Sequence, residues 1–425
     1  KGPSSLLYAN GTIGGIINVV DDLISTKNFE IPEVSVGYES QSVNDGNSEF
    51  VNLKGNVGGF NVNFGYKNTD FGNYDVPSGA VIHSEEEHHD DEDHDEDEHH
   101  DDEHSEEDLG YINNSDFAVE ATKFGVSKVT DWGYIGFGID NLESVYGIPF
   151  HGDEHGDEHG DEHGDEEEHE EHGEERIFST TDSETFSIRG SYNVNGSLVN
   201  KVDFTYRDSD YSLTEAHAEE EHHEEEDHEE EEEHEEHAPT VFMNEAVEYG
   251  ATFDISNDSS TQKVVVNFVD EDNSIVGEEA FMNPANSEEF TIGYYLSKDL
   301  GTFDLDFGFR LDQIERSGSV SEEEHEDDHG DDHGDEHGDE HGDVDYYNID
   351  DTTSSFAITL GRDLSDNLGI SLGYASVERL PSSIELFMNG PHMATGRFEV
   401  GDPNLNSETS NNFDITFNFD NGDFY

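Results

Sequence analysis

Apolar and polar residues alternate strictly along several segments of this chain, and a period of two restricts those segments to β-strands. From Phe303 to Leu311 every second residue is Phe or Leu, and the residues between them are Asp, Gly or Arg. The same alternation runs through residues 60–65, 135–140, 202–207 and 413–419. Each segment therefore has one apolar and one polar face. The segments run roughly 9–15 residues, long enough to cross a bilayer as tilted strands.

The connections between these segments are alternately short and long. Short turns are expected at residues 58–59, 130–133, 193–197, 256–261, 298–301, 363–367 and 420–422, and longer links at 43–46, 75–112, 147–180, 214–240, 270–287, 317–346 and 379–408. In an up-and-down sheet alternate connections lie at the same end. Short turns at one end and long loops at the other indicate a transmembrane antiparallel up-and-down β-barrel, with about 14 complete strands here. A soluble β-sandwich or solenoid with its apolar faces inward is the alternative, and it leaves this asymmetry unexplained.

Four tracts within the long links hold most of the charge, at residues 83–108, 151–175, 215–237 and 322–345. They contain 24 of the 25 histidines and no Lys or Arg. Residues 151–166 and 329–343 repeat a His-Gly-Asp-Glu/Asp tetrad. Such runs cannot fold alone, because like charges repel and nothing apolar is available to bury. Since all four fall in the long links, we expect all four to project from one end of the barrel.

The histidines in these tracts argue against an inert acidic spacer, because a spacer needs no imidazole. Imidazole with carboxylate, in a chain without Cys, suits Zn²⁺, and Ni²⁺ or Cu²⁺ after it. Binding requires neutral imidazole, so we expect many weak sites whose affinity falls between about pH 7 and 5.5. The candidate ligands in the tracts are His88, His89, His99, His100, His151, His155, His159, His163, His222, His223, His329, His333, His337 and His341.

The charge balance excludes several classes of function. With 17 Lys and Arg against 107 Asp and Glu, the net charge is −90, which excludes a protein that neutralises nucleic-acid phosphates. It also disfavours a basic face for anionic lipid headgroups. Outside the tracts an acidic excess remains, which a polar, water-facing lumen would accommodate. An enzyme is not expected, because flexible repeats fix no ligand set and no His-Glu-x-x-His motif occurs.

Residues 2–20 contain Gly-Pro-Ser-Ser-Leu-Leu-Tyr, followed by Gly-Thr-Ile-Gly-Gly-Ile-Ile-Asn-Val. This stretch resembles the end of the plug domain of TonB-dependent outer-membrane receptors. Gly11, Gly14 and Gly15 permit tight bends, and Ile16–Val20 predicts a short buried strand. A phosphate-binding loop is the rival interpretation, but no Lys-Ser/Thr follows the glycines.

A second stretch, residues 378–410, resembles the mid-barrel loop of the same receptors. Its Asn-Gly-Pro-His-Met-Ala-Thr-Gly segment is most similar to the zinc-uptake branch, whereas Arg-Leu-Pro and Pro-Asn-Leu are also shared with haem receptors. His392 is the one histidine outside the tracts. Gly390 permits an unusual bend and Pro391 fixes φ, so this turn can be rigid. We expect His392 to bind metal near the extracellular mouth, with Glu385 or Glu399 completing or orienting it.

The resemblance implies a domain organisation and a function. Residues 1–28 would be the end of the plug, and residues 29–425 part of a barrel that has 22 strands in the family. The chain would then be a fragment, without the plug segment that contacts TonB and without the closing strand. The implied protein imports zinc through the Gram-negative outer membrane, in contact with lipid and with the TonB energy-transducing complex. A haem or metal-chelate receptor on the same fold, or a surface metal buffer, is the alternative.

Overall fold

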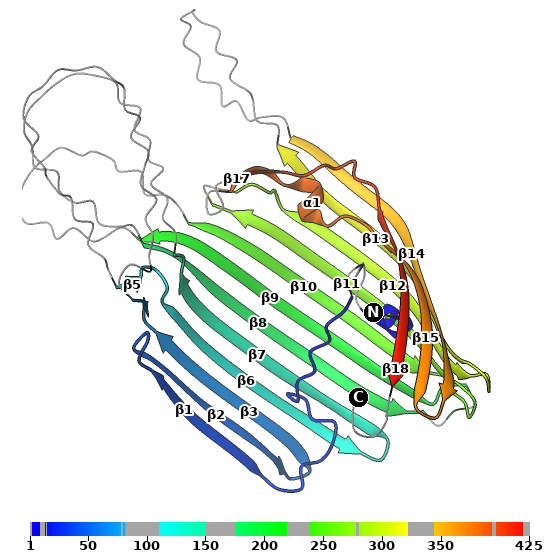
Figure 1. The fold of residues 1–425 in the computed structure, drawn as a ribbon. Coiled ribbons are helices and arrows are strands. Elements are labelled where there is room, and N and C mark those ends of the chain that lie inside the picture. Colours follow the sequence, from blue (N-terminus) through cyan, green and yellow to red (C-terminus); the bar gives the residue numbers. More distant parts are fainter. Residues whose placement is uncertain are drawn as a thin grey trace, which may run out of the picture.

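A computed structural model describes residues 2–8, 13, 15–77, 80, 110–149, 176–194, 196, 198–218, 239–277, 280–321, 344–392 and 397–419. Most of them belong to one antiparallel meander of 14 strands (Figure 1). Within the described ranges no helix is both long and apolar enough to cross a membrane. The strands in order are β1 (Glu33–Gln41), β2 (Gly46–Val57), β3 (Phe60–Phe71), β6 (Phe117–Thr130), β7 (Gly133–Gly147), β8 (Arg176–Asn193), β9 (Lys201–Ala218), β10 (Thr240–Asp254), β11 (Thr261–Val276), β12 (Ala285–Asp299), β13 (Asp304–Ser321), β14 (Val344–Ser365), β15 (Leu368–Arg379) and β18 (Glu408–Phe419).

Several strands extend farther at their long-link ends than the alternation predicts. Strand lengths run from 9 residues in β1 to 22 in β14, against the expected 9–15. The predicted links 147–180, 214–240, 270–287 and 317–346 are too wide, because the flanking strands continue into them. Residues 270–273 are polar on both faces, so the period of two disappears there although the backbone ladder of β11 with β10 and β12 continues. The boundaries at the short turns between described strands agree within a few residues.

The apolar side chains lie on the convex face of the curved sheet, and polar ones on the concave face. On β13, Phe309 and Leu311 are each 41% exposed, whereas Arg310 between them is 3% exposed. A soluble sandwich would bury the Phe and Leu side and expose the Arg side. The observed arrangement is that of a wall between lipid and a polar lumen, as the alternation predicts.

The N-terminal segment crosses the concave face of the sheet (Figure 1). The 3₁₀-helix η1 (Pro3–Leu7) lies against β12, β13 and β14, where Arg310 Nη1 donates to the carbonyl of Tyr8. The backbone approaches so closely that a Cβ at Gly308 would overlap the carbonyl oxygen of Pro3. Farther along, the Asn63 side chain of β3 donates to the carbonyls of residues 22 and 23, at 2.6 and 2.9 Å.

The predicted buried strand at Ile16–Val20 is wrong. Residues 15–22 form no strand, and Ile17 and Val19 are 93% and 86% exposed. A strand needs a partner edge for its N–H and C=O groups. Among the described residues no strand pairs with this segment, and several of its apolar side chains are exposed.

Part of the acidic excess outside the tracts lies on the convex face, above the apolar band, and another part lies on the concave face, where it includes Glu248, Glu271, Glu289 and Asp312. The acidic residues of the convex face share it with the exposed Phe and Leu side chains but sit nearer the long-link end of each strand. We call them the acidic belt. The register sets its carboxylates directly opposite one another across neighbouring strands, in the pairs Glu120–Glu143, Glu143–Asp182, Glu184–Asp210, Asp210–Glu245, Glu245–Asp272, Asp270–Glu288, Glu288–Glu315 and Glu315–Asp350.

Among the side chains that the structure describes, the cations on the convex face lie at the opposite, short-turn edge of the sheet. Lys128 lies over the ring of Phe60, with its ammonium 4.4 Å from the ring centroid. Arg362 lies over Phe303 at 5.5 Å. Lys298, near the end of β12, belongs to the same edge. The wall is therefore basic at its short-turn edge and acidic toward its long-link edge.

Candidate metal site

The candidate ligands in the four tracts lie outside the described residues. This holds for His88, His89, His99, His100, His151, His155, His159, His163, His222, His223, His329, His333, His337 and His341. The strand ends that flank the tracts are described, and they all lie at one edge of the meander. His392, Glu385 and Glu399 are described, and the site is built from them.

His392 lies in a small hairpin that belongs to the connection between β15 and β18. The hairpin pairs β16 (Asn389–His392) with β17 (Arg397–Val400) and follows the short helix α1 (Ser383–Phe387). α1 starts with a capping box, in which Ser382 and Glu385 each bind the other's backbone N–H. Leu386 and Phe387 of α1 are both 1% exposed.

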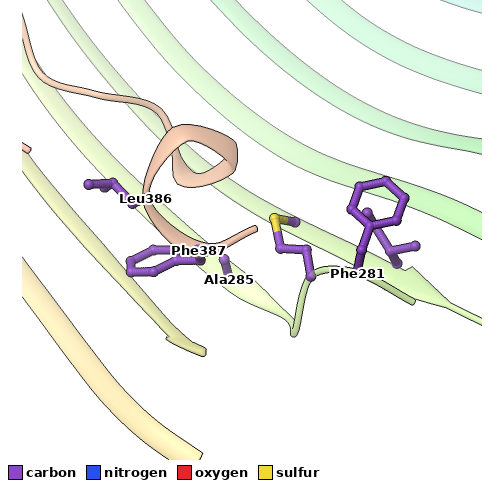
Figure 2. Close-up of a cluster of buried hydrophobic side chains, with 6 residues drawn as sticks. Phe281, Ala285, Leu386 and Phe387 are labelled. Carbon is purple, nitrogen blue, oxygen red and sulfur yellow. The ribbon is translucent and has the colours of Figure 1, made fainter. Parts of the chain in front are cut away.

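The hairpin and α1 are fixed to the long-link end of the sheet by a small apolar cluster. Figure 2 shows Leu386 and Phe387 from α1 beside Ala285 of β12, and Phe281 from the connection between β11 and β12. Arg316 of β13 adds a polar anchor: its Nε donates to the Pro381 carbonyl at 2.8 Å, and Nη2 donates to Glu289 at 2.8 Å. This combination of caps, apolar contacts and charged hydrogen bonds makes the hairpin a well-supported element.

The imidazole of His392 lies between a carboxylate and an aromatic ring. Nδ1 is 3.2 Å from Glu399 Oε1, on the facing strand of the hairpin. The ring stacks on Phe281, with 4.7 Å between centroids and 27° between planes. Phe242 of β10 approaches at 6.1 Å. A carboxylate at Nδ1 is the partner that orients metal-binding histidines and leaves Nε2 as the ligand atom.

Glu385 has a different role from the one expected. Its carboxylate accepts hydrogen bonds from Arg379 Nη1 and Nη2, both at 2.8 Å, and from Ser382. The Arg379 hydrogen bonds, with those from Ser382, lower the pKa of Glu385 to about 2. The carboxylate is thus used to fix the start of α1, and Glu399 is the acid that contacts His392.

The described part of the chain supplies two potential ligands here, not a complete metal site. Across those residues no three His, Asp or Glu side chains come together in a way that could hold an ion. Zn²⁺ sites use three or four protein ligands. His392 and Glu399 therefore form a partial site that needs donors from elsewhere.

The hairpin lies beside the strand ends that lead into two of the tracts. The Asn389 side chain donates to the carbonyl of Ser321 at 2.8 Å, and Ser321 is the last residue of β13 before the fourth tract. Tyr347, near the start of β14, stacks on Phe387 at 6.4 Å. Phe242 stands near the start of β10, which follows the third tract. His392 is thus adjacent to the bases of the third and fourth tracts.

Sequence reasoning missed Phe281 and Phe242. Both lie far from His392 in the chain and in segments without a motif. In the sequence, each is simply an aromatic residue near an expected long link, and many other positions fit that description. The turn expected at Gly390 and Pro391 is instead part of strand β16, in which Gly390 has a φ of 155°.

A shallow polar depression of about 270 Å³ lies on the concave face near the hairpin. Asn244, the next concave-face residue of β10 after Phe242, lines it together with Arg207, Glu248 and Glu271. Asn244 donates to Glu271 at 2.6 Å. One guanidinium among two carboxylates gives a mixed surface, which is unlike the donor set of a bare divalent cation.

Solved structures of outer-membrane receptors resemble this fold. The Serratia marcescens hemophore receptor HasR, in complex with HasA and heme, has a TM-score of 0.65 at 11% identity, covering 100% of this chain and 57% of that one. The copper transporter OprC has a TM-score of 0.65 at 12% identity, and the match covers 100% of this chain and 56% of that one. The FrpB iron transporter from Neisseria meningitidis (F3-3 variant) has a TM-score of 0.56 at 11% identity, and the match covers 89% of this chain and 51% of that one. The chain thus spans little more than half of each.

A family model, described as TonB dependent receptor-like, beta-barrel, matches residues 37–425, which is most of the chain. This span begins within β1 and includes every later strand of the meander. The match and the apolar convex wall lead to the same conclusion: this chain belongs to the β-barrel family of TonB-dependent receptors, which are outer-membrane receptors of Gram-negative bacteria and not enzymes.

Proposed function

We propose that this chain is part of a receptor that imports zinc across the outer membrane. The observation that carries the proposal is the setting of His392. The one histidine outside the tracts is held in a supported hairpin, against a carboxylate, beside strand ends that lead into His-rich tracts. A fixed imidazole next to a carboxylate is suited to selecting an ion that has been gathered nearby.

The four tracts would gather the ion. Many weak His and carboxylate contacts exchange rapidly and raise the local concentration of the ion at the extracellular end. Zn²⁺ fits imidazole and carboxylate best, with Ni²⁺ and Cu²⁺ as competitors. The ion would then pass to Nε2 of His392, which Glu399 orients through Nδ1, and its remaining ligands would come from a tract or from the plug.

Residues 1–28 fit the end of a plug domain. The described part of this segment lies against the concave face through a backbone contact at Gly308 and side-chain hydrogen bonds from Asn63. Energy from the TonB complex, acting through the rest of the plug, would release the ion to the periplasm. Zinc, outer-membrane lipid and TonB are therefore the proposed partners.

A receptor for haem or a metal chelate is the second candidate. HasR was solved with heme, and FrpB is named as an iron transporter. A single well-supported histidine near the mouth is also what haem ligation would use. The 24 tract histidines favour a free ion, since haem needs one or two axial ligands. A surface metal buffer would need no segment inside the barrel, and this chain has one.

The test is a His392→Ala substitution in the full-length receptor. We expect growth at limiting zinc to be lost while the cells keep most of their surface zinc binding. Arg397→Ala is the matched control, because Arg397 faces His392 across the same hairpin. Unchanged zinc-limited growth in His392→Ala would sink the proposal. Loss of growth on haem, with zinc-limited growth intact, would establish the second candidate.

A further inference from the structure

Phe281 joins the connection between β11 and β12 to the hairpin of His392. The backbone N–H of Asn389 donates to the Phe281 carbonyl at 2.7 Å. Met282 and Met388 form an isolated antiparallel bridge next to it. Residues 281–282 therefore lie beside the start of β16, joined to it by one backbone hydrogen bond and one isolated bridge.

The approach at this point is too close for an ordinary side chain on the hairpin. A Cβ at Gly390 would come within 2.9 Å of Phe281 Cβ, and the φ of Gly390 lies in the region that favours glycine. With the backbones this close, the Phe281 ring reaches the face of the His392 imidazole and stacks on it. Phe281 is itself 2% exposed, so its ring has little freedom to move.

We propose that Phe281 is a positioning residue for His392, and this inference rests on the proposed function of that histidine. Glu399 fixes the direction of Nδ1, and the Phe281 ring fixes the plane of the imidazole. Together they set the line along which Nε2 meets an ion. A ring that is held in place loses less rotational freedom on binding, so affinity is gained before any further ligand arrives.

A packing role would give a different result from a positioning role, and the chain contains a matched control. Phe387 is the same residue type, is equally buried and belongs to the same cluster, but its ring stacks on Tyr347 instead of His392. Phe281→Leu and Phe387→Leu therefore remove comparable apolar contact. Only the first removes the stacking partner of the imidazole.

The experiment measures zinc uptake by the full-length receptor as a function of zinc concentration. We expect Phe281→Leu to raise the KM about 10-fold with little change in maximal rate, as for other groups that orient metal ligands. Phe281→Tyr should keep the parental KM, because the ring is retained. Phe387→Leu should change the KM less than about 2-fold, below the range expected for a group that orients a ligand.

Two outcomes would overturn the inference, and they differ from each other. If Phe281→Leu and Phe387→Leu raise the KM equally while His392→Ala abolishes uptake, Phe281 only packs, and the proposed zinc site stands. If His392→Ala leaves uptake unchanged, the zinc site fails and the positioning role fails with it.

Discussion

At the scale of single residues, the candidate site separates two carboxylates that look alike in sequence. Glu399 contacts His392, whereas Glu385 is held by Arg379 and Ser382 at the start of α1. Spacing alone could not distinguish them, because each lies seven residues from the histidine. The register of the hairpin decides, since it sets Glu399 opposite Gly390.

The lowered pKa of Glu385 predicts that this carboxylate stays ionised, and keeps its hydrogen bonds at the start of α1, over the pH range in which imidazoles become protonated. A carboxyl with a folded-state pKa of about 2 stabilises the fold fully above its unfolded value of 4.5, and that contribution is lost as pH falls through 2. Between pH 7 and 5.5 it is unchanged. Over that range the neutral fraction of a histidine with the reference pKa of about 6.5 falls roughly 8-fold.

Zinc binding by the purified full-length receptor should therefore fall about 8-fold from pH 7 to 5.5, following the neutral imidazole. Limited proteolysis within residues 380–407 should stay the same across this range. Cleavage that appears together with the loss of zinc would show that the hairpin unfolds, and the imidazole explanation would then be wrong.

At the scale of elements, alternation predicted the strands that face lipid and failed at their ends. Phe303–Leu311 and the comparable segments are membrane-facing because one face meets lipid and the other a polar lumen. Where the strands continue past the lipid, both faces meet polar surroundings and the pattern vanishes. Contacts between segments that are distant in the chain, such as that of Phe281 with His392, also produce no periodic pattern in the sequence.

The close contact at Gly308 predicts how the N-terminal segment is held. Gly308→Ala should displace η1, because the new Cβ would overlap the Pro3 carbonyl. Gly361→Ala is the control on the neighbouring strand, where an added Cβ would come no closer than 3.7 Å to any neighbouring atom. The chain has no Cys, so a single Ser5→Cys can report on the segment.

Thiol labelling of the Ser5→Cys receptor should be faster by several-fold with Gly308→Ala, through local opening. It should be unaffected by Gly361→Ala. Equal labelling in both variants would mean that η1 is held by other contacts.

The acidic belt predicts a mutation that stabilises the barrel. Glu245 faces Asp210 on one side and Asp272 on the other. Like charges directly opposite on a sheet are unfavourable, and opposite charges contribute about 0.2–1 kcal/mol per pair. Glu245→Lys should therefore raise the free energy of unfolding by about 1 kcal/mol in low salt.

The effect can be measured on the receptor in detergent as the temperature at which the folded band is lost in heat-modifiability gels, after incubation at low and at high NaCl. The gain should shrink at 1 M NaCl, where charges are screened beyond about 3 Å. Glu245→Gln is the control, and it should give about half the gain. A loss of stability with Glu245→Lys would show that the repulsion in the belt is already neutralised.

At the scale of the whole molecule, the four tracts are not equivalent. The Asn389–Ser321 hydrogen bond places the hairpin at the base of the fourth tract. The second tract joins β7 to β8, and β9 separates β8 from β10. We therefore expect the fourth tract to supply His392 more directly than the second.

The repeats offer a matched comparison. His329, His333, His337 and His341 can be changed to Gln in one receptor, and His151, His155, His159 and His163 in another, so that four tetrads lose imidazole in each. Total zinc binding should fall equally. Uptake at limiting zinc should fall further in the first variant, and an equal fall would mean that all tracts feed the site alike.

The polarised charge of the wall also determines how such a barrel can be assembled. Carrying one charged side chain to the bilayer centre costs about 2.5–3.5 kcal/mol even by the mildest measurements. The edge with the acidic belt and the tracts must nonetheless reach the far side of the membrane. That edge cannot travel through hydrocarbon, so it has to cross along a water-filled path while the sheet is still open. The short-turn edge, which carries fewer charges, would follow as the trailing edge.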